Sequence, residues 1–364
     1  MNWLNTTVGD MYFLKYGKAL SKQDQYASGT PVYGSNGVYT FTDKSLAGPY
    51  VVIVGRKGSV GKVHLSKTPC WVSDTAFYLE FNSISEAYYS YYLLLTLGLE
   101  NMNTDAAVPG LNRDNAHRLE INLPNCPQQR ANLIKPLIDV DEKILLNKQI
   151  NQTLEEMAQA IFKNWFVDFD PVKAKAQVIA QGGSEQDANL AAMQIISGKT
   201  RDQLAALEHT HPEQYTQLHT TASLFPSAFV DSELGEIPEG WFRHSAEALI
   251  EFNPKESLKK GVSAPYIDMA SLPTNGSWVG EPINRAFGSG MKFRNFDTLF
   301  ARITPCLENG KTAFVQSLPS NTVGWGSTEF IVMRSKKPIP STFTYLLARS
   351  DELRQHAIKS MTGT

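Results

Sequence analysis

The feature that most constrains this chain is a run of residues in its middle whose spacing alternates between four and three. Such spacing forms the a/d seam of a heptad repeat, so it predicts a long helix that packs on another helix as a coiled coil. An ordinary amphipathic helix packed on a globular core is the alternative interpretation. The seam consists of Leu133, Leu137, Val140, Ile144, Asn147, Asn151, Leu154, Ala158, Ile161 and Trp165.

Two residue types modify this predicted helix. Asn147 and Asn151 place polar side chains in the seam, where a buried asparagine fixes the register at a cost in stability. Pro136 lacks a backbone N–H, so we expect a kink or a restart of the helix there. From residue 128 to residue 166 the helix would be roughly 57 Å long at ~1.5 Å per residue.

Mixed segments of short strands and glycine turns flank the predicted helix. In the first segment, residues 50–54 are a β-branched run of buried-strand type and residues 31–37 are a turn between strands. Residues 71–81 carry another strand, and residues 85–99 a buried helix. We therefore expect an α+β protein with mixed α/β domains at 1–124 and 233–364, each containing small β-sheets. The spacer helix would occupy 125–170, and a helical or partly ordered connector 171–232.

The two mixed domains resemble each other. Residues 54–57 are similar to residues 301–304, and residues 73–77 to residues 327–330. In both copies an aromatic- and leucine-rich helix follows. Duplication of a unit indicates that the same task is performed twice, at two places.

Composition limits the class of protein. The chain has a hydrophobic content of 42%, a formal net charge of −2 and a pI of about 6.4. It can therefore build cores, but any contact with nucleic acid must be local or supported by a partner. The cysteines at 70, 126 and 306 lack ligand spacing, and neither a signal peptide nor a membrane span is visible. We expect a soluble cytoplasmic protein with reduced thiols.

Motifs of catalysis are incomplete. Residues 55–62 are similar to a phosphate-binding loop, but the spacing is one residue too long and Val63 replaces the Ser or Thr that holds magnesium. Asn253 and Pro254 begin a motif of amino-methyltransferases whose second proline and aromatic residue are lacking. Asp141, Glu142 and Lys143 are interpreted as the solvated face of the helix. We expect no cofactor, metal or catalytic residue on this chain; an enzyme fragment remains the alternative.

Basic residues instead gather on glycine-bearing loops at equivalent places of the two copies. Lysine and arginine neutralise phosphates, and Arg, Asn, Ser and Thr can contact base edges. Asp74 and Glu329 could accept hydrogen bonds from cytosine amino groups. The candidate DNA-binding residues are Ser35, Asn36, Arg56, Lys57, Ser59, Lys62, Asp74, Thr75 and Arg113 in the first domain, and Arg294, Arg302, Thr304, Lys311, Ser327, Thr328 and Glu329 in the second.

Four segments of the chain resemble a known family, the specificity subunits of type I restriction–modification systems. Residues 31–37 and 55–61 are similar to segments of the family's target-recognition domains, and residues 233–241 to the beginning of its second one. The most specific resemblance is that of residues 141–171 to the central spacer.

This resemblance implies two recognition domains that each read one half of a split DNA target in the major groove. Modification subunits would supply S-adenosylmethionine and adenine-N6 methylation, and a restriction subunit would supply ATP- and Mg-dependent translocation and cleavage. The specificity subunit itself carries no catalytic residue.

The sequence departs from the family's pattern because no second spacer helix follows the second domain. We expect truncation of a longer product; a split gene or a helix borrowed from another chain are alternatives. The alternative function is a coiled-coil scaffold, or half-specificity fragment, that assembles with other chains without reading DNA alone.

The basic loop gives a first prediction. The double variant Arg56→Glu, Lys57→Glu should weaken DNA binding by the assembled complex, because it replaces two positive charges by negative ones beside phosphates. Binding titrations over a salt series measure the effect. Equal affinity of variant and parent at every salt concentration would rule out this loop as a phosphate contact.

Overall fold

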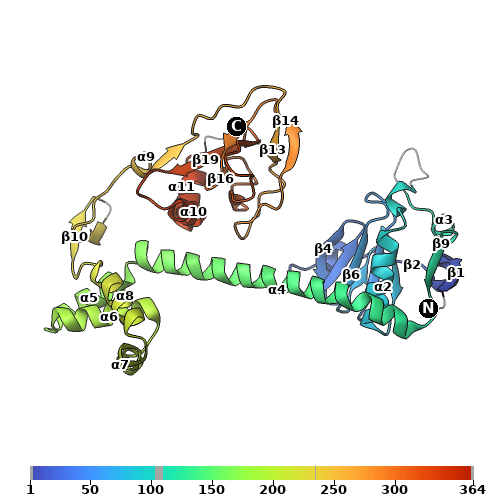
Figure 1. Ribbon diagram of the computed structural model, residues 1–364, viewed down its shortest axis with the longest axis horizontal. Coiled ribbons are helices and arrows are strands. Elements are labelled where there is room, and N and C mark those ends of the chain that lie inside the picture. The colour runs from blue at the N-terminus through green and yellow to red at the C-terminus, as the bar shows by residue number, and fades with distance from the viewer. Residues whose placement is uncertain (1–2, 103–109, 234, 362–364) are drawn as a thin grey trace. The chain divides into compact units, whose positions relative to one another are not determined.

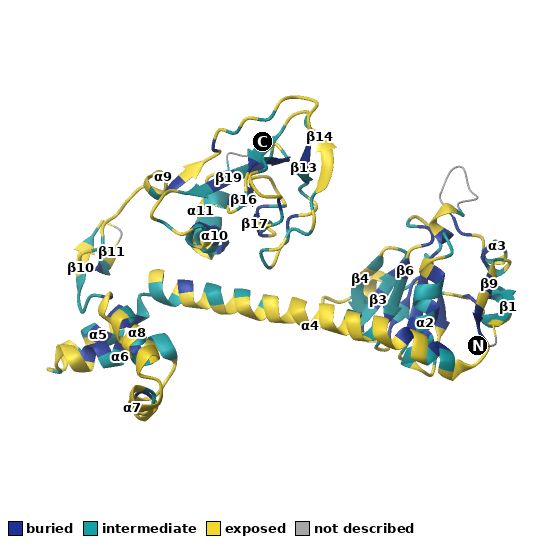
Figure 2. Ribbon diagram, in the orientation of Figure 1, coloured by how far each residue is buried: buried dark blue, intermediate teal, exposed yellow. Residues whose placement is uncertain are grey.

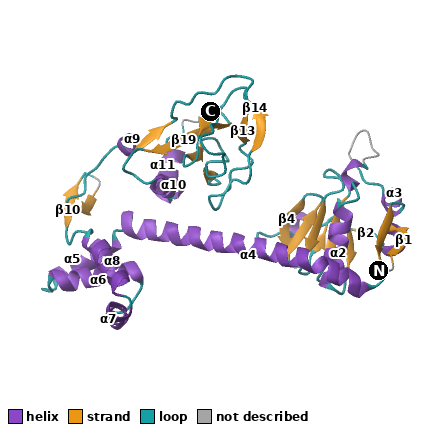
Figure 3. Ribbon diagram, in the orientation of Figure 1, coloured by secondary structure: helices purple, strands orange, loops and turns teal. Residues whose placement is uncertain are grey.

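The computed structural model describes residues 3–102, 110–233 and 235–361 (Figure 1). Residues 1–2, 103–109, 234 and 362–364 lie outside the described residues. The chain divides into compact units, Met1–Leu146 and Asn147–Thr364, and helix α4 (Pro127–Phe166) runs through the boundary. Both units contain small β-sheets packed with helices, so the predicted α+β class is confirmed (Figure 3).

The main sheet of the first unit is antiparallel, in the order β2-β8-β5-β6. Its central strand β5 is a run of valine and isoleucine ending in Gly55, and all five residues are buried. β-branched residues suit such a strand because their side chains pack well on the pleated surface. Helix α2 (Ile84–Leu95) contacts β5 and β6. The strands are β2 (Lys15–Tyr16), β8 (Ala76–Glu80), β5 (Val51–Gly55) and β6 (Val63–Ser66).

A three-stranded sheet, in the order β4-β3-β7, completes this unit with the pair β1-β9. Strands β3 and β7 are parallel, whereas β3 and β4 form an antiparallel hairpin. The short helices α1 and α3 contact each other. The bounds are β3 (Thr30–Gly34), β4 (Gly37–Thr42), β7 (Trp71–Val72), β1 (Trp3–Thr7), β9 (Glu120–Pro124), α1 (Val8–Met11), α3 (Arg113–His117), η1 (Lys22–Asp24) and η2 (Leu99–Asn101).

The second unit repeats both sheets. Its strand orders are β12-β19-β16-β17 and β14-β13-β18-β15. Helix α10 (Ser341–Arg349) contacts β16, β17 and β19 and is followed by α11 (Asp351–Lys359). The strands are β12 (Ile250–Phe252), β19 (Phe330–Ser335), β16 (Thr298–Ala301), β17 (Thr312–Phe314), β14 (Ile283–Ala286), β13 (Ser263–Ile267), β18 (Gly324–Gly326) and β15 (Met291–Phe293); the pair β10 (Phe229–Ser232) and β11 (Gly235–Pro238) and helix α9 (Ala246–Leu249) precede them.

Strand register supports the internal repeat but shifts the predicted alignment by one residue, because Gly55 rather than Val54 corresponds to Ala301. In the first unit Gly55 of β5 lies opposite Ala76 of β8. In the second unit Ala301 of β16 lies opposite Phe330 of β19. The parallel pair β3–β7 likewise corresponds to the parallel pair β13–β18. At these strand ends, Gly55 and Ala76 of the first unit therefore correspond to Ala301 and Phe330 of the second.

Two strand boundaries differ from the sequence predictions. The strand predicted over 71–81 is two strands, β7 and β8, because a turn at Ser73–Thr75 interrupts it. The Ser73 hydroxyl accepts a hydrogen bond from the Thr75 N–H in this turn, which competes with the ladder. The turn predicted over 31–37 is confined to Ser35 and Asn36, since Pro31–Gly34 belong to β3.

The segment between the long helix and the second set of sheets forms four helices: α5 (Asp170–Ala180), α6 (Glu185–Ser197), α7 (Arg201–Thr210) and α8 (Pro212–Ser223). Capping boxes begin α6 at Ser184 and α7 at Thr200. Small and apolar residues, among them Met193 and Leu204, are buried where these helices meet. The histidines of this segment form no metal site, since no group of metal ligands occurs among the described residues.

Helix α4 is continuous over 40 residues, and its middle is largely exposed (Figure 2). The expected restart at Pro136 is wrong: the proline lies inside the helix, whose remaining hydrogen bonds outweigh the one that proline removes. Most seam residues are exposed; Leu154, for example, is 56% exposed. Trp165 is a correction, because its ring packs on Phe225 rather than continuing the exposed stripe. The coiled coil stays a prediction for the rest of the seam.

Each end of α4 packs on its own unit. In the first unit Arg130 is buried and pairs with Glu86, with Nε 3.1 Å from the carboxylate. The hydroxyl of Tyr92 donates to Asp141 at 2.8 Å. The sequence suggested that Asp141 belongs to a solvated face of the helix. In the structure it also accepts a hydrogen bond from Tyr92 and so connects α4 to α2. The burial raises the pKa of Tyr92 to about 12, and its bond to the Asp141 carboxylate acts in the same direction.

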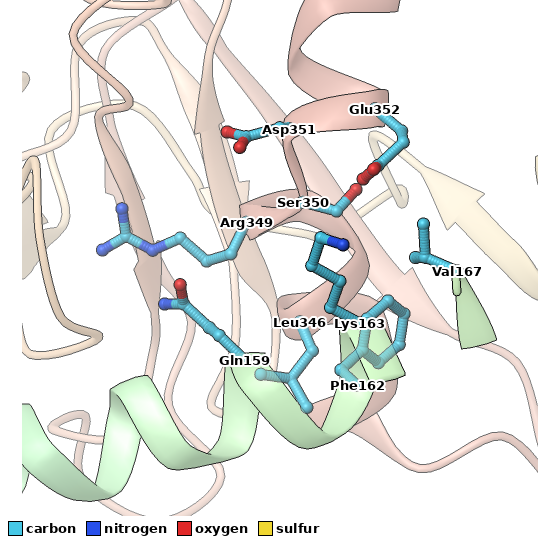
Figure 4. Close-up of a pocket in the computed structure, with 9 residues that line it drawn as sticks. All are labelled: Gln159, Phe162, Lys163, Val167, Leu346, Arg349, Ser350, Asp351 and Glu352. Atoms are coloured by element: carbon cyan, nitrogen blue, oxygen red, sulfur yellow. The ribbon is translucent and has the colours of Figure 1, made fainter. Parts of the chain in front are cut away.

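In the second unit the aromatic end of α4 packs on α10. The ring of Phe162 lies 5.3 Å from that of Phe343, and the Tyr345 hydroxyl donates to Glu155 of α4 at 2.5 Å. A small cavity of about 110 Å³ remains beside this contact, lined among others by Phe162 and Lys163 of α4, Leu346 of α10 and Glu352 of α11 (Figure 4). The contact fixes the end of α4 against the sheets of the same unit.

Candidate nucleic-acid interface

Two turns of the first unit meet around a groove. One is the Ser35–Asn36 turn between β3 and β4, and the other is the Ser73–Thr75 turn between β7 and β8. The groove has a volume of about 430 Å³. Its lining residues are Gly34, Ser35, Asn36, Gly37, Val38, Tyr39, Ser73, Asp74 and Thr75.

Hydrogen bonds between hydroxyl groups and the backbone hold these turns together. The Thr75 hydroxyl lies 2.7 Å from the Ser73 hydroxyl and accepts from the Ser35 N–H at 3.3 Å. The Asp74 carboxylate, between them, is exposed to solvent. A polar, preorganised rim of this kind presents hydrogen-bonding groups on short, rigid loops, which base edges require.

The basic loop between β5 and β6 packs against the first of these turns. Lys62 donates from Nζ to Asn36 Oδ1 at 2.6 Å, and Ser59 donates to the same oxygen at 3.4 Å. Gly55 allows this close approach, because a Cβ there would lie 2.1 Å from the Ser59 carbonyl oxygen. Ser35, Asn36, Ser59 and Lys62, all members of the candidate set, are therefore brought together.

Two arginines of the candidate set flank one tyrosine. Arg56 donates from Nε and Nη2 to the Asp74 carbonyl oxygen, at 3.2 and 2.7 Å. Its guanidinium lies 5.3 Å from the Tyr16 ring centre, and that of Arg113 lies 4.9 Å from the same ring. Sequence analysis missed the exposed aromatic residues here, Phe13, Tyr16 and Tyr39. Tyr16 and Tyr39 lie in the short strands β2 and β4, and Phe13 lies in the loop before β2, so no periodic pattern marked them.

Lys57 is exposed at the tip of the basic loop, where its backbone bridges to Gly110. The first unit thus gathers its candidates on one end of its sheets: the turn residues, the basic loop and the two arginines at Tyr16. This arrangement combines exposed cations with a polar groove, so it can contact phosphates and base edges together.

The equivalent end of the second unit holds fewer of the candidates. Arg302 follows β16 and Glu329 precedes β19, and Nε of Arg302 lies 2.9 Å from Oε2 of Glu329. Thr328 donates to the other carboxylate oxygen at 3.3 Å, and the Ser327 hydroxyl accepts from the Glu329 N–H. This turn reproduces the Ser73–Thr75 turn with a charged residue in the place of Thr75.

Three other candidates of the second unit have different partners. Arg294 pairs with Glu256 at 2.7 Å, in a network that also contains Arg334 and Asp297. Lys311 donates to the Met269 carbonyl oxygen at 2.7 Å. The Thr304 hydroxyl faces the Met361 sulfur at 3.8 Å. None of these contacts joins them to the Arg302–Glu329 pair.

Two groups at these turns have shifted pKa values. Burial lowers the pKa of His64, whose ring faces the Ser35 carbonyl oxygen; the nearby Lys62 charge lowers it further, and the carbonyl contact opposes both. The hydrogen bond from Arg302 lowers the pKa of Glu329. The environment of the first turn thus favours the neutral form of His64, whereas that of the second turn favours the ionised form of Glu329.

Within the described residues, no cluster of His, Cys, Asp or Glu could hold a metal ion, and the cysteines are free thiols. No helix in the described part of the chain is both long and apolar enough to cross a membrane.

Comparison with known proteins shows which family the first unit is similar to. Residues 1–156 match the family described as type I restriction modification DNA specificity domain. This part of the chain is thus similar to the type I restriction–modification specificity family. The match includes all of the candidate interface of the first unit and the first three quarters of α4.

Individual relatives agree with this family. The specificity subunit of the type I restriction enzyme HindI from Haemophilus influenzae is 48% identical over 177 residues, covering 45% of this chain and 38% of that protein. The MjaIX specificity subunit from Methanocaldococcus jannaschii is 26% identical over 126 residues, covering 34% and 29%. The matched stretches thus span less than two fifths of these relatives' lengths. The solved S subunit of a type I restriction–modification system from M. genitalium is 15% identical, with a TM-score of 0.47, over 99% of this chain and 79% of that one.

His64 predicts a pH dependence of stability. Its pKa is lowered from 6.5 in the folded chain, so the unfolded chain binds more protons as the pH falls below that value. Stability should therefore decrease from about pH 6.5 towards about pH 5, and part of this decrease should vanish in His64→Gln. Urea midpoints across this range measure it, with the exposed His244→Gln as control. His117, whose pKa burial also lowers, accounts for a remaining slope. An unchanged slope in His64→Gln would contradict the assignment.

Proposed function

We propose that this chain reads a bipartite DNA target, with each of its two mixed domains contacting one half of the target. The basic loop after β5, together with the Ser35–Asn36 turn and the Ser73–Thr75 turn before β8, would contact the first half-site. The turn that carries Arg302 and Glu329 would contact the second. The chain itself would be non-catalytic and would position the enzymes that act on DNA.

The observation that carries this proposal is the duplicated sheet with its residue-by-residue register. Arg56 and Arg302 both follow the buried central strand, and each donates its backbone N–H to the residue before the partner strand, Thr75 or Glu329. Two copies of one polar surface within a chain suit a target that has two separate halves. Residues 1–156 match a family that is described as a DNA specificity domain, which supports DNA recognition by the first copy.

The near-neutral charge indicates that the chain does not hold DNA by itself. With a formal net charge of −2, it lacks the positive field that unaided binding requires. Modification subunits that bind S-adenosylmethionine and methylate adenine would close around the DNA. A restriction subunit that uses ATP and Mg would join them.

The exposed stripe of α4 would serve assembly rather than DNA contact. Leu133, Leu137, Ile144, Leu154 and Ile161 are all more than two fifths exposed, which leaves an apolar surface unpartnered among the described residues. A continuous apolar stripe on a long helix indicates a site for another helix or subunit. Asn147 and Asn151 would fix the register of that contact.

The proposal is tested by co-expressing the chain with its cognate modification subunit in a host that lacks DNA methylation. Methylated adenines are then mapped by sequencing. We expect a split motif whose two halves are unrelated, because two different recognition surfaces act.

A split palindrome would contradict the assignment of one half-site to each domain, since it would mean that two copies of one domain read the target. A stable complex without any methylated motif would favour the scaffold function instead. The charge-reversal variant of Arg56 and Lys57 is the matched loss-of-contact control in the same assay.

A further inference from the structure

The two recognition surfaces differ at one pair of equivalent positions. Strand register places Arg56 opposite Thr75 in the first unit and Arg302 opposite Glu329 in the second. A neutral hydroxyl in one copy thus corresponds to a carboxylate in the other. Both copies have an arginine at this place, so replacement of the hydroxyl by a carboxylate changes the hydrogen-bond partner of the arginine side chain.

In the second unit the arginine is held by the carboxylate but keeps free donors. Nε of Arg302 donates to Oε2 of Glu329, and the side chains are 55% and 33% exposed. No other hydrogen bond of Arg302's side chain occurs within residues 3–102, 110–233 and 235–361. Its two terminal NH₂ groups therefore remain available, next to a carboxylate whose Oε1 carries only the long bond from Thr328.

In the first unit the corresponding arginine is differently engaged. Arg56 uses Nε and Nη2 on the Asp74 carbonyl oxygen and lies over the Tyr16 and Phe77 rings. The Thr75 hydroxyl is occupied by Ser73 and by the Ser35 N–H. Among the described residues, Arg56 forms no ion pair with the neighbouring Asp74 carboxylate, so this copy lacks the arginine–carboxylate pair of the second unit.

Charge argues against a phosphate contact for the second arginine. An Arg–Glu pair has no net charge, and its carboxylate repels a phosphate. Neutralising phosphates requires unpaired cations, as in the basic loop of the first unit. An exposed ion pair also contributes little to folding stability, so stability alone does not explain its presence.

The pair instead matches one base pair in the major groove. Guanine presents two acceptors there, N7 and O6, and the paired cytosine presents the N4 amino donor beside them. Two arginine NH₂ donors followed by a carboxylate acceptor have the complementary order.

We propose that Arg302 and Glu329 act together as a reader of one G·C base pair in the second half-site. Arg302 donates to guanine, and Glu329 accepts from the cytosine amino group while orienting the guanidinium. The inference rests on the proposed function and adds the identity of one base pair to it.

The test uses the assembled methyltransferase with the full chain carrying Arg302→Ala or Glu329→Ala. Each variant should relax recognition at the same single G·C position, lowering discrimination against the other base pairs by about 5- to 150-fold, the range for one bidentate contact. The first half-site should be read unchanged in both, which also shows that the variants fold and assemble. Glu308→Gln, an exposed change in the same loop, is the matched control and should leave the motif intact.

A uniform loss of affinity for every sequence would overturn the inference, because it would identify Arg302 as a phosphate contact. A second half-site without a G·C pair, or relaxation at different positions in the two variants, would also overturn it. After any of these three outcomes, the proposed function would still hold if the parent complex methylates a split motif. The absence of any split motif from the parent complex would overturn both.

Discussion

The register between the central strand and its neighbour determines what each recognition surface can present. β5 and β16 are fully buried, so their side chains are fixed by the packing on both faces of the sheet. A shift of one residue would send every side chain to the opposite face. The buried strands therefore determine that Arg56 follows one strand end and Arg302 the other, each beside the turn that precedes the partner strand.

Both turns are built from the same hydrogen bond but end in different chemistry. In each, a serine hydroxyl accepts from the N–H two residues later, Ser73 from Thr75 and Ser327 from Glu329. The backbone is thus determined by a local interaction that tolerates replacement of the third residue. The two turns therefore have the same backbone bond but differ in their third residue. The first copy presents the hydroxyl of Thr75 and the second the carboxylate of Glu329.

Helix α4 passes through three different environments along its length. Arg130 and Ile134 are buried in the first unit, and Phe162 is buried in the second. Between these contacts the helix exposes apolar residues such as Ile144 and Leu154. Since the apolar seam continues through segments that pack in different ways, the heptad pattern cannot be explained by packing within either unit. We propose that this pattern serves the contact with another helix or subunit.

Sequence patterns predicted the repeat and the long helix, because buried β-branched strands, heptad spacing and glycine loops are local signals. They did not predict the break at Ser73–Thr75 or the continuity of α4 through Pro136, since each depends on a balance of hydrogen bonds. The pairing of Arg302 with Glu329, like the position of Arg56 over Tyr16, depends on register between distant segments. Trp165 fitted the seam by spacing, but the Phe225 ring, contributed by a distant residue, determines its environment.

The most direct measurement of the central claim is site-specific cross-linking from equivalent positions of the two turns. Cys126 and Cys306, which are exposed or partly exposed, are first replaced by serine. A cysteine at position 74 or 328 then carries a photoactivatable aryl azide in the complex bound to its target. The duplicated register predicts cross-links from position 74 to bases of one half-site and from position 328 to bases of the other. Cross-links from both positions to the same half-site, or to protein only, would contradict it.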